Sequence, residues 1–267
     1  MSDSVLWDLD EAVATITLNR PAAMNALTVE MKGALRDMVH QAASDRRVRA
    51  LVITGAGKGF CAGQDLREHA QLLDDAAADG LVAAATDTVR EHYNPIVLTL
   101  TSMPKPVIAA VNGMAAGAGA GMALACDFRI MARQASFLMA FARVGLAADS
   151  GTSWTLQRLA GLGRAAELLM LAEPVPADRA LQYGLATSVV DDTGLAEAAR
   201  SLAQRLAAGP TAAYAGIKQQ LSFSSAHSLI ESLDKEADVQ AAVGRTADHR
   251  DATVAFTRKE QATFQGH

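Results

Sequence analysis

The chain has 267 residues, half of them apolar, and its 24 basic and 29 acidic side chains leave a formal net charge of −5. This length allows one large domain or two small ones with a buried core, and the lack of a basic block argues against nucleic acid as a partner. Cys61 and Cys126 are too few for a disulfide framework, and the acidic N-terminus lacks the basic region of a signal peptide, so we expect a cytoplasmic protein.

The first two thirds of the chain alternate predicted strands with predicted helices. Apolar residues from Met31 to Val39 recur with the spacing of one helix face. The run at 114–126 is too short and too rich in glycine to span a bilayer, so we expect a buried helix there. In chain order, strands are predicted at 12–19, 49–55, 105–113, 128–132 and 186–190, and helices around 31–39, from 74 to about 101 and at 114–126.

After Gly194, almost every segment of the chain predicts helix. The helices are expected at 195–209, 211–223, 226–243 and 251–259. Strands alternate with helices first and helices dominate later, which favours an α/β fold. We therefore divide the chain into a core at 1–194 and a helical C-terminal region at 195–267.

Several familiar motifs are incomplete in this sequence. Residues 55–60 lack the Lys-Ser/Thr ending of a phosphate-binding loop, and Met122 stands where a dinucleotide fingerprint needs glycine. Ser153 is not flanked by the glycines of a nucleophile elbow, and the histidines show no metal-ligand spacing, so no metal is expected. Cys61 has no histidine in a dyad pattern, which favours a small buried thiol over a nucleophile.

Two glycine-containing turns and one acid survive this comparison. The turns at 59–66 and 112–127 each adjoin a predicted buried strand, where glycine lets the backbone approach a ligand and point N–H groups at it. Asp149 is the lone acid of the otherwise small and apolar stretch 141–154. Two backbone donors with a nearby carboxylate would form an oxyanion hole and a general base.

From about residue 12 to 264, the chain resembles the enoyl-CoA hydratase/isomerase (crotonase) superfamily. The resemblance implies a ClpP-like spiral of ββα units, a helical C-terminal trimerisation region, and a trimer or dimer of trimers. It also implies an acyl-CoA thioester substrate, whose CoA moiety is the only cofactor-like group, and no membrane partner. The matching segments are 19–27, 57–66, 105–121, 125–132, 142–169, 177–190 and 255–260.

The resemblance assigns roles to individual positions. The backbone N–H groups of Gln64 and Ala118 match the oxyanion donors, and Asp149 resembles the catalytic aspartate of ring-1,2-epoxyphenylacetyl-CoA isomerases and Δ3,Δ2-enoyl-CoA isomerases. The residues expected to contact CoA are Ala23, Met24, Ala26, Ala62, Gly63, Gln64, Asp65, Leu66 and Lys259. The expected acyl pocket is formed by Gly117, Gly121, Phe141 and Leu146.

The departures from the family pattern decide between reactions. Gly121 and Phe141 stand where hydratases carry two glutamates, so two-glutamate hydration is not expected. Asp149 alone would suffice to move a proton from C2 to C4 of a 3-enoyl thioester, which predicts an isomerase. The alternatives are weak hydration by Asp149 alone, an aryl-CoA dehalogenase whose tryptophan and histidine positions hold Phe141 and Asn94, and a non-catalytic acyl-CoA binder. Asp149 would otherwise cap a helix that begins near Ser150.

Overall fold

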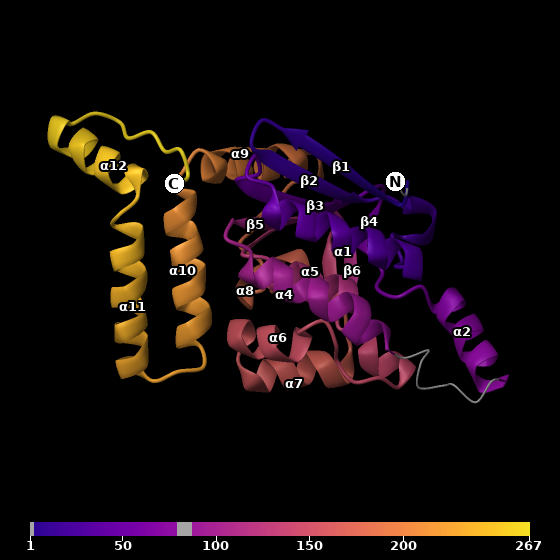
Figure 1. The fold of residues 1–267 in the computed structure, drawn as a ribbon. Coiled ribbons are helices and arrows are strands. Elements are labelled where there is room, and N and C mark those ends of the chain that lie inside the picture. The colour runs from indigo at the N-terminus through magenta and orange to yellow at the C-terminus, as the bar shows by residue number, and fades with distance from the viewer. Residues whose placement is uncertain (1–2, 79–86) are drawn as a thin grey trace.

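The computed structural model describes residues 3–78 and 87–267 as two sheets surrounded by helices (Figure 1). The larger sheet has the strand order β1-β2-β3-β5-β7-β10, and the smaller has the order β4-β6-β8-β9. The larger sheet contains β1 (Val5–Asp10), β2 (Val13–Leu18), β3 (Ala50–Gly55), β5 (Val107–Val111), β7 (Phe128–Ala132) and β10 (Ser188–Val190). The smaller contains β4 (Gly59–Cys61), β6 (Met114–Ala116), β8 (Ser136–Leu138) and β9 (Val175–Pro176).

One unit, two strands followed by a helix, recurs along the chain. In β3-β4-α2 and β5-β6-α5, the first strand joins the larger sheet, the second joins the smaller sheet, and a helix follows. The expected spiral of ββα units is therefore confirmed. The helices are α1 (Val29–Ser44), α2 (Leu66–Ala78), α4 (Asn94–Ser102), α5 (Ala118–Ala125), α6 (Thr152–Ala160), α7 (Leu162–Leu171), α8 (Ala177–Gln182), α9 (Leu195–Ala207), α10 (Thr211–Ser224), α11 (Leu229–Val243) and α12 (Ala247–Arg258), with short turns η1 (Pro21–Ala23), η2 (Val89–Tyr93), η3 (Ala140–Val144) and η4 (Asp192–Gly194).

The structure corrects two element predictions. The expected helix at 114–126 begins as strand β6, and α5 starts only at Ala118, after Gly117 turns the chain with φ +51° and ψ −123°. A strand of three residues is too short to show an alternating pattern, which is why the sequence hides it. The helix expected from 74 to about 101 is in fact divided: α2 starts earlier, η2 and α4 follow, and 79–86 lie outside the described residues.

The larger sheet forms the centre of the core. Its parallel strands are apolar on both faces, and β5 is buried along its whole length. Figure 1 shows α9 on one side of this sheet and α1 with α4 on the other. α9 contacts β3, β5 and β7, whereas α10, α11 and α12 extend away from the sheets at one end of the molecule. Within residues 3–78 and 87–267, no helix is long and apolar enough to cross a membrane.

Two side chains fasten the C-terminal helices to the core. The Lys218 ammonium on α10 lies 2.8 Å from a carboxylate oxygen of Asp127 and also donates to the Lys105 carbonyl at 3.0 Å. Arg49, the residue before β3, donates to the Thr211 hydroxyl and to the Phe264 carbonyl, both at 2.9 Å.

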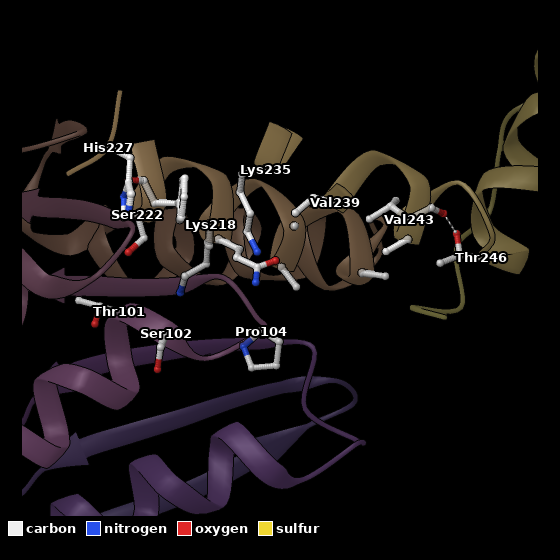
Figure 2. Close-up of a pocket in the computed structure, with 16 residues that line it drawn as sticks. Thr101, Ser102, Pro104, Lys218, Ser222, His227, Lys235, Val239, Val243 and Thr246 are labelled. Atoms are coloured by element: carbon white, nitrogen blue, oxygen red, sulfur yellow. Dashed lines mark hydrogen bonds between the residues drawn. The ribbon is translucent and has the colours of Figure 1, made fainter. Parts of the chain in front are cut away.

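A groove of about 840 Å³ lies between the end of α4 and the antiparallel pair α10–α11. Figure 2 shows Lys218, His227 and Lys235 along this groove, opposite Ser102 and Pro104 of the core. The groove is separate from the two glycine turns, so it is not the place where the expected site residues gather.

Candidate active site

The loop that follows β2 lies directly beside the loop that follows β4. The N–H of Ala62 donates to the Met24 carbonyl at 2.9 Å. Leu27 donates to the Gly63 carbonyl at 2.8 Å and accepts from the N–H of Asp65 at 3.0 Å. These bonds join two segments that are about forty residues apart, and they bring most of the residues expected to contact CoA into one place.

Asn25 holds the first of these loops in position. It is fully buried in the left-handed region, with φ +58°, a conformation that asparagine tolerates better than most residues. Its side-chain N–H₂ group donates to the carbonyls of Gly59 at 2.8 Å and Ala56 at 3.0 Å, and its side-chain oxygen accepts from the N–H of Arg20 at 2.8 Å. One amide thereby satisfies several loop groups that would otherwise be buried without partners.

The expected CoA contacts are gathered only in part. Leu66 at the start of α2 belongs to the same region as the two loops. The Asp65 carboxylate already forms an ion pair with Arg20 at 2.9 Å. Lys259 follows α12, and Figure 1 places α12 at the opposite end of the molecule from α2. Within one chain, Lys259 therefore lies far from the two loops.

Two backbone N–H groups are available beside these loops. Gln64 pairs with Leu27 as an isolated parallel bridge. The hydrogen bonds of this bridge are made by Gly63 and Asp65, the two neighbours of Gln64. The N–H of Gln64 itself therefore points away from Leu27. Ala118 is the first residue of α5, where an N–H has no acceptor within its own helix. A Cβ on Gly63 would lie 3.5 Å from the Ala118 nitrogen, so the two donor segments are in contact.

Both donor residues line one cavity of about 370 Å³. Gly117, Phe141 and Leu146 line it as expected, and Asp149 is the one carboxylate among its described lining residues. Leu146 is 55% exposed and Leu66 is 52% exposed, which leaves large apolar surface at the opening. Exposed apolar side chains around a cavity with a few converging polar groups are typical of a site for a largely apolar ligand.

The hydrogen bonding and the pKa of the Asp149 carboxylate depend on neighbouring side chains and on burial, not on a helix N-terminus. Its Oδ1 accepts the Ser150 hydroxyl at 2.8 Å. Burial raises the pKa of this carboxyl above its ordinary value, and the Ser150 hydrogen bond and the Lys32 charge oppose that rise. Helix α6 begins at Thr152 with Gly151 as its N-cap residue. Among the described residues, the Asp149 carboxylate accepts from the Ser150 hydroxyl and from no N–H of that helix, so the capping interpretation of Asp149 is wrong.

The sequence analysis missed a buried polar cluster behind the cavity. The hydroxyl of Tyr93 donates to the side-chain carbonyl of Gln64 at 3.1 Å. The ammonium of Lys32 donates to the Thr88 hydroxyl at 2.6 Å, and the same hydroxyl lies 3.2 Å from Nδ1 of His92. One signal was present in the sequence: Lys32 lies three residues before an apolar position of the predicted helix and adjoins another, on the face that should be buried.

Gly121 does not line the cavity, contrary to expectation, because it packs against the segment that carries Asp149. A Cβ at this position would lie 2.6 Å from the Thr152 hydroxyl oxygen and 2.7 Å from the Ser150 Cβ. The close approach of α5 to this segment therefore requires glycine.

We expect Gly121→Ala to lower the free energy of unfolding by about 1–3 kcal/mol, because the added methyl group overpacks this contact. The added methyl group would also displace Ser150, whose hydroxyl donates to Asp149, so turnover should fall as well. Urea denaturation checks the first effect. Gly163→Ala is the matched control, since a Cβ at that helical position meets nothing within 4 Å, and it should be neutral or stabilising. Equal stability of the two variants would contradict the packing argument.

Cys61 is a buried thiol, as the sequence predicted. It hydrogen-bonds to the Asn25 carbonyl at 3.4 Å, and burial raises its pKa to about 12. A thiol that stays protonated at neutral pH does not act as a nucleophile.

The chain is similar to known proteins over nearly its whole length. The enoyl-CoA hydratase/isomerase family profile matches residues 8–267. The chain is 41% identical to the 1,2-epoxyphenylacetyl-CoA isomerase of Escherichia coli, over 100% of both chains. It is 34% identical to the trans-2-decenoyl-(acyl-carrier-protein) isomerase of Streptococcus mutans, over 98% of both chains. A crystal structure of an enoyl-CoA hydratase/isomerase candidate from Mycobacterium abscessus matches with a TM-score of 0.93 and 42% identity, over 98% of this chain and 100% of that one.

Proposed function

The chain belongs to the enoyl-CoA hydratase/isomerase family, and from this premise we propose that it isomerises an acyl-CoA thioester with Asp149 as the acid/base group. The observation that carries the proposal is the position of Asp149, the one carboxylate among the described residues that line the cavity with Gln64 and Ala118. Gly121 and Phe141 replace the glutamate pair of typical hydratases, so no second carboxylate is available to position a water molecule.

The reaction divides into two proton transfers. The Asp149 carboxylate removes a proton from C2 of a 3-enoyl thioester, and the electron pair moves onto the thioester oxygen to give an enolate. The protonated Asp149 then returns the proton to C4, which leaves the double bond between C2 and C3. The N–H groups of Gln64 and Ala118 would stabilise the enolate oxygen, and one such donor typically contributes roughly 2.7–4 kcal/mol.

The acyl group is either an unsaturated chain or a ring that carries an epoxide next to the thioester. The relative from Escherichia coli is by its name an isomerase of a ring epoxide, and that from Streptococcus mutans is an isomerase of a 2-decenoyl chain. Both names support isomerisation. The apolar side chains around the cavity suit either group.

A turnover screen tests the proposal. The purified protein is offered a 3-enoyl-CoA, 1,2-epoxyphenylacetyl-CoA and crotonyl-CoA, and the products are separated by chromatography. We expect isomerisation of one of the first two and little hydration of crotonyl-CoA. Hydration at a kcat above about 10³ s⁻¹, the top of the usual range, would overturn the preference for isomerase.

We also propose that the protein is cytoplasmic and assembles as a trimer or a dimer of trimers. Light scattering of the purified protein would test the assembly.

The pH dependence of turnover should report the titration of Asp149. The base must be ionised, so kcat/KM should fall as the pH drops through its pKa. Because burial raises that pKa, the midpoint of the acid limb should lie above 3.8, the ordinary value of an aspartate. Steady-state kinetics between pH 4 and 9 provide the measurement, and circular dichroism at each pH shows that the protein stays folded. A midpoint at or below the ordinary value would argue against a buried base.

A further inference from the structure

We propose that Lys32 is a positioning residue whose buried positive charge keeps the Asp149 carboxylate in its ionised, proton-accepting form. This inference rests on the proposed function, because it concerns the state of the base in the same cavity. Lys32 is not itself among the described residues that line the cavity. It would act through Asp149 and would not touch the substrate.

The burial of Lys32 is the first observation. Its side chain is on α1 and is 0% exposed, although lysine is almost never fully buried without a charged or strongly polar partner. Its ammonium group donates to the Thr88 hydroxyl at 2.6 Å and lies 5.4 Å from the centre of the Tyr93 ring. A neutral hydroxyl and an aromatic face offset only part of the cost of removing an ammonium group from water.

The location of Lys32 is the second observation. Thr88 and Tyr93, which contact the ammonium group, both line the cavity that Asp149 also lines. Lys32 is therefore directly behind the wall of the cavity that Asp149 lines. Burial lowers the pKa of Lys32, and the Glu68 and Asp149 charges oppose that change and favour the charged ammonium form. Charges that are buried away from bulk water interact more strongly than charges at the protein surface.

The other titratable groups nearby do not replace this charge. Burial lowers the pKa of His92, and the Lys32 charge lowers it further, so the imidazole is neutral at neutral pH. Burial also raises the pKa of Tyr93, which stays a neutral phenol. Glu68 on α2 is a second anion facing Lys32, held by the N–H of Val29 at 2.8 Å. The remaining groups around the cluster, among the described residues, are Glu91 on η2, Arg36 on α1, His69 on α2 and the buried thiol of Cys61.

The sign of the effect follows from these charges. Burial pushes the Asp149 carboxyl toward its protonated form, in which it accepts no proton from substrate. A fixed cation lowers the pKa of a neighbouring carboxyl and extends the ionised form to lower pH. Removal of the Lys32 charge should therefore raise the pKa of Asp149 and move the acid limb of kcat/KM to higher pH.

Lys32→Met is the test, because methionine is unbranched, uncharged and suited to a buried position. We expect the acid limb to shift upward by about one pH unit, which is a tenfold lower kcat/KM at any pH well below the midpoint. The KM at high pH should stay within twofold. Lys32→Arg should restore most of the original profile. Arg200→Met removes one positive charge from an exposed position on α9 and should leave the profile unchanged.

A second measurement does not depend on turnover. Carboxyl ¹³C NMR follows the titration of Asp149, assigned by the signal that Asp149→Asn removes, in the wild type and in Lys32→Met. The expected result is the same upward shift of about one unit. If Lys32→Met does not fold, Lys32→Gln replaces it in both experiments.

The outcomes separate the two proposals. An unchanged pH profile and an unchanged NMR titration in a folded, charge-free variant would overturn the role of Lys32, even if Asp149→Asn abolishes turnover. A shifted titration together with normal turnover in Asp149→Asn would support the coupling between the two charges, while the proposed function would fail. A change in melting temperature with no change in either titration would show that Lys32 is only structural.

Discussion

Asp149→Asn is expected to lower kcat for isomerisation by about 10³–10⁴-fold, because both proton transfers depend on one carboxylate. The amide has the same shape, and its oxygen can still accept from the Ser150 hydroxyl, which lies 2.8 Å from Oδ1 of Asp149 in the wild type. It is far too weak a base to remove a proton from C2. The affinity for the CoA ester should stay nearly unchanged, since the proposed role of Asp149 involves the reacting carbons and not the CoA moiety.

Two measurements on this variant belong together. The rate of turnover of a 3-enoyl-CoA reports on the chemistry, and calorimetric titration with a saturated acyl-CoA reports on binding. Normal turnover would rule out Asp149 as the base. Loss of both turnover and binding would point to a misfolded cavity. Ser150→Ala helps to recognise that case, because it removes the hydroxyl that donates to Asp149 while keeping the carboxylate.

The same substitution should stabilise the protein at neutral pH. Burial raises the pKa of Asp149 in the folded chain, so ionisation favours the unfolded state. This penalty is absent below the ordinary aspartate pKa and present above the folded value. Asp149→Asn removes it, and we expect a higher melting temperature than the wild type at pH 7 with equal values near pH 3. Carboxylates of active sites often lower the stability of the folded protein, because activity requires them to be ionised in a buried place.

The second large effect concerns a main-chain group. Ala118→Pro removes the N–H expected to bind the enolate oxygen, and proline is tolerated at the first position of a helix, which Ala118 occupies in α5. We expect kcat to fall about 10²–10³-fold, the usual loss for one oxyanion donor. The KM should change much less, because the donor acts mainly on charge that develops in the transition state.

Ala118→Gly is the matched control for this experiment. It changes the same side chain and keeps the N–H, so its kcat should remain close to that of the wild type. Circular dichroism and the melting temperature of both variants show whether α5 is preserved. A proline variant that folds normally and retains full turnover would exclude the Ala118 N–H from the reaction.

Much of the fold could be predicted from periodicity. The strands at 12–19, 49–55 and 105–113 were found because a buried or half-buried strand has a distinct local pattern, and β2, β3 and β5 confirm them. The three-residue strands β4, β6 and β8 were not found, because so few residues carry no period, and the six-residue strand β1 was missed as well. The division of the chain at residue 194 stays a prediction, and α9, just after it, packs against the larger sheet.

The sequence by itself determined the parts of the candidate site that have a local signature. The glycine turns around Gly63 and Gly117 show where the backbone must bend or be approached closely, and both have positive φ in the structure. The lone acid Asp149 and the apolar replacements at the glutamate positions can also be identified without coordinates. These are properties of a residue and its immediate neighbours, so they are visible in the order of the letters.

Only the tertiary structure decided how these parts act together. It joined the loops around Asn25 and Gly63, placed Asp149 beside the cavity instead of at a helix cap, and turned Gly121 against Thr152. It also set the charge of Lys32 behind the cavity wall, more than one hundred residues from Asp149 in sequence. Burial, electric field and steric contact depend on distances between segments that fold together, and no local pattern records those distances.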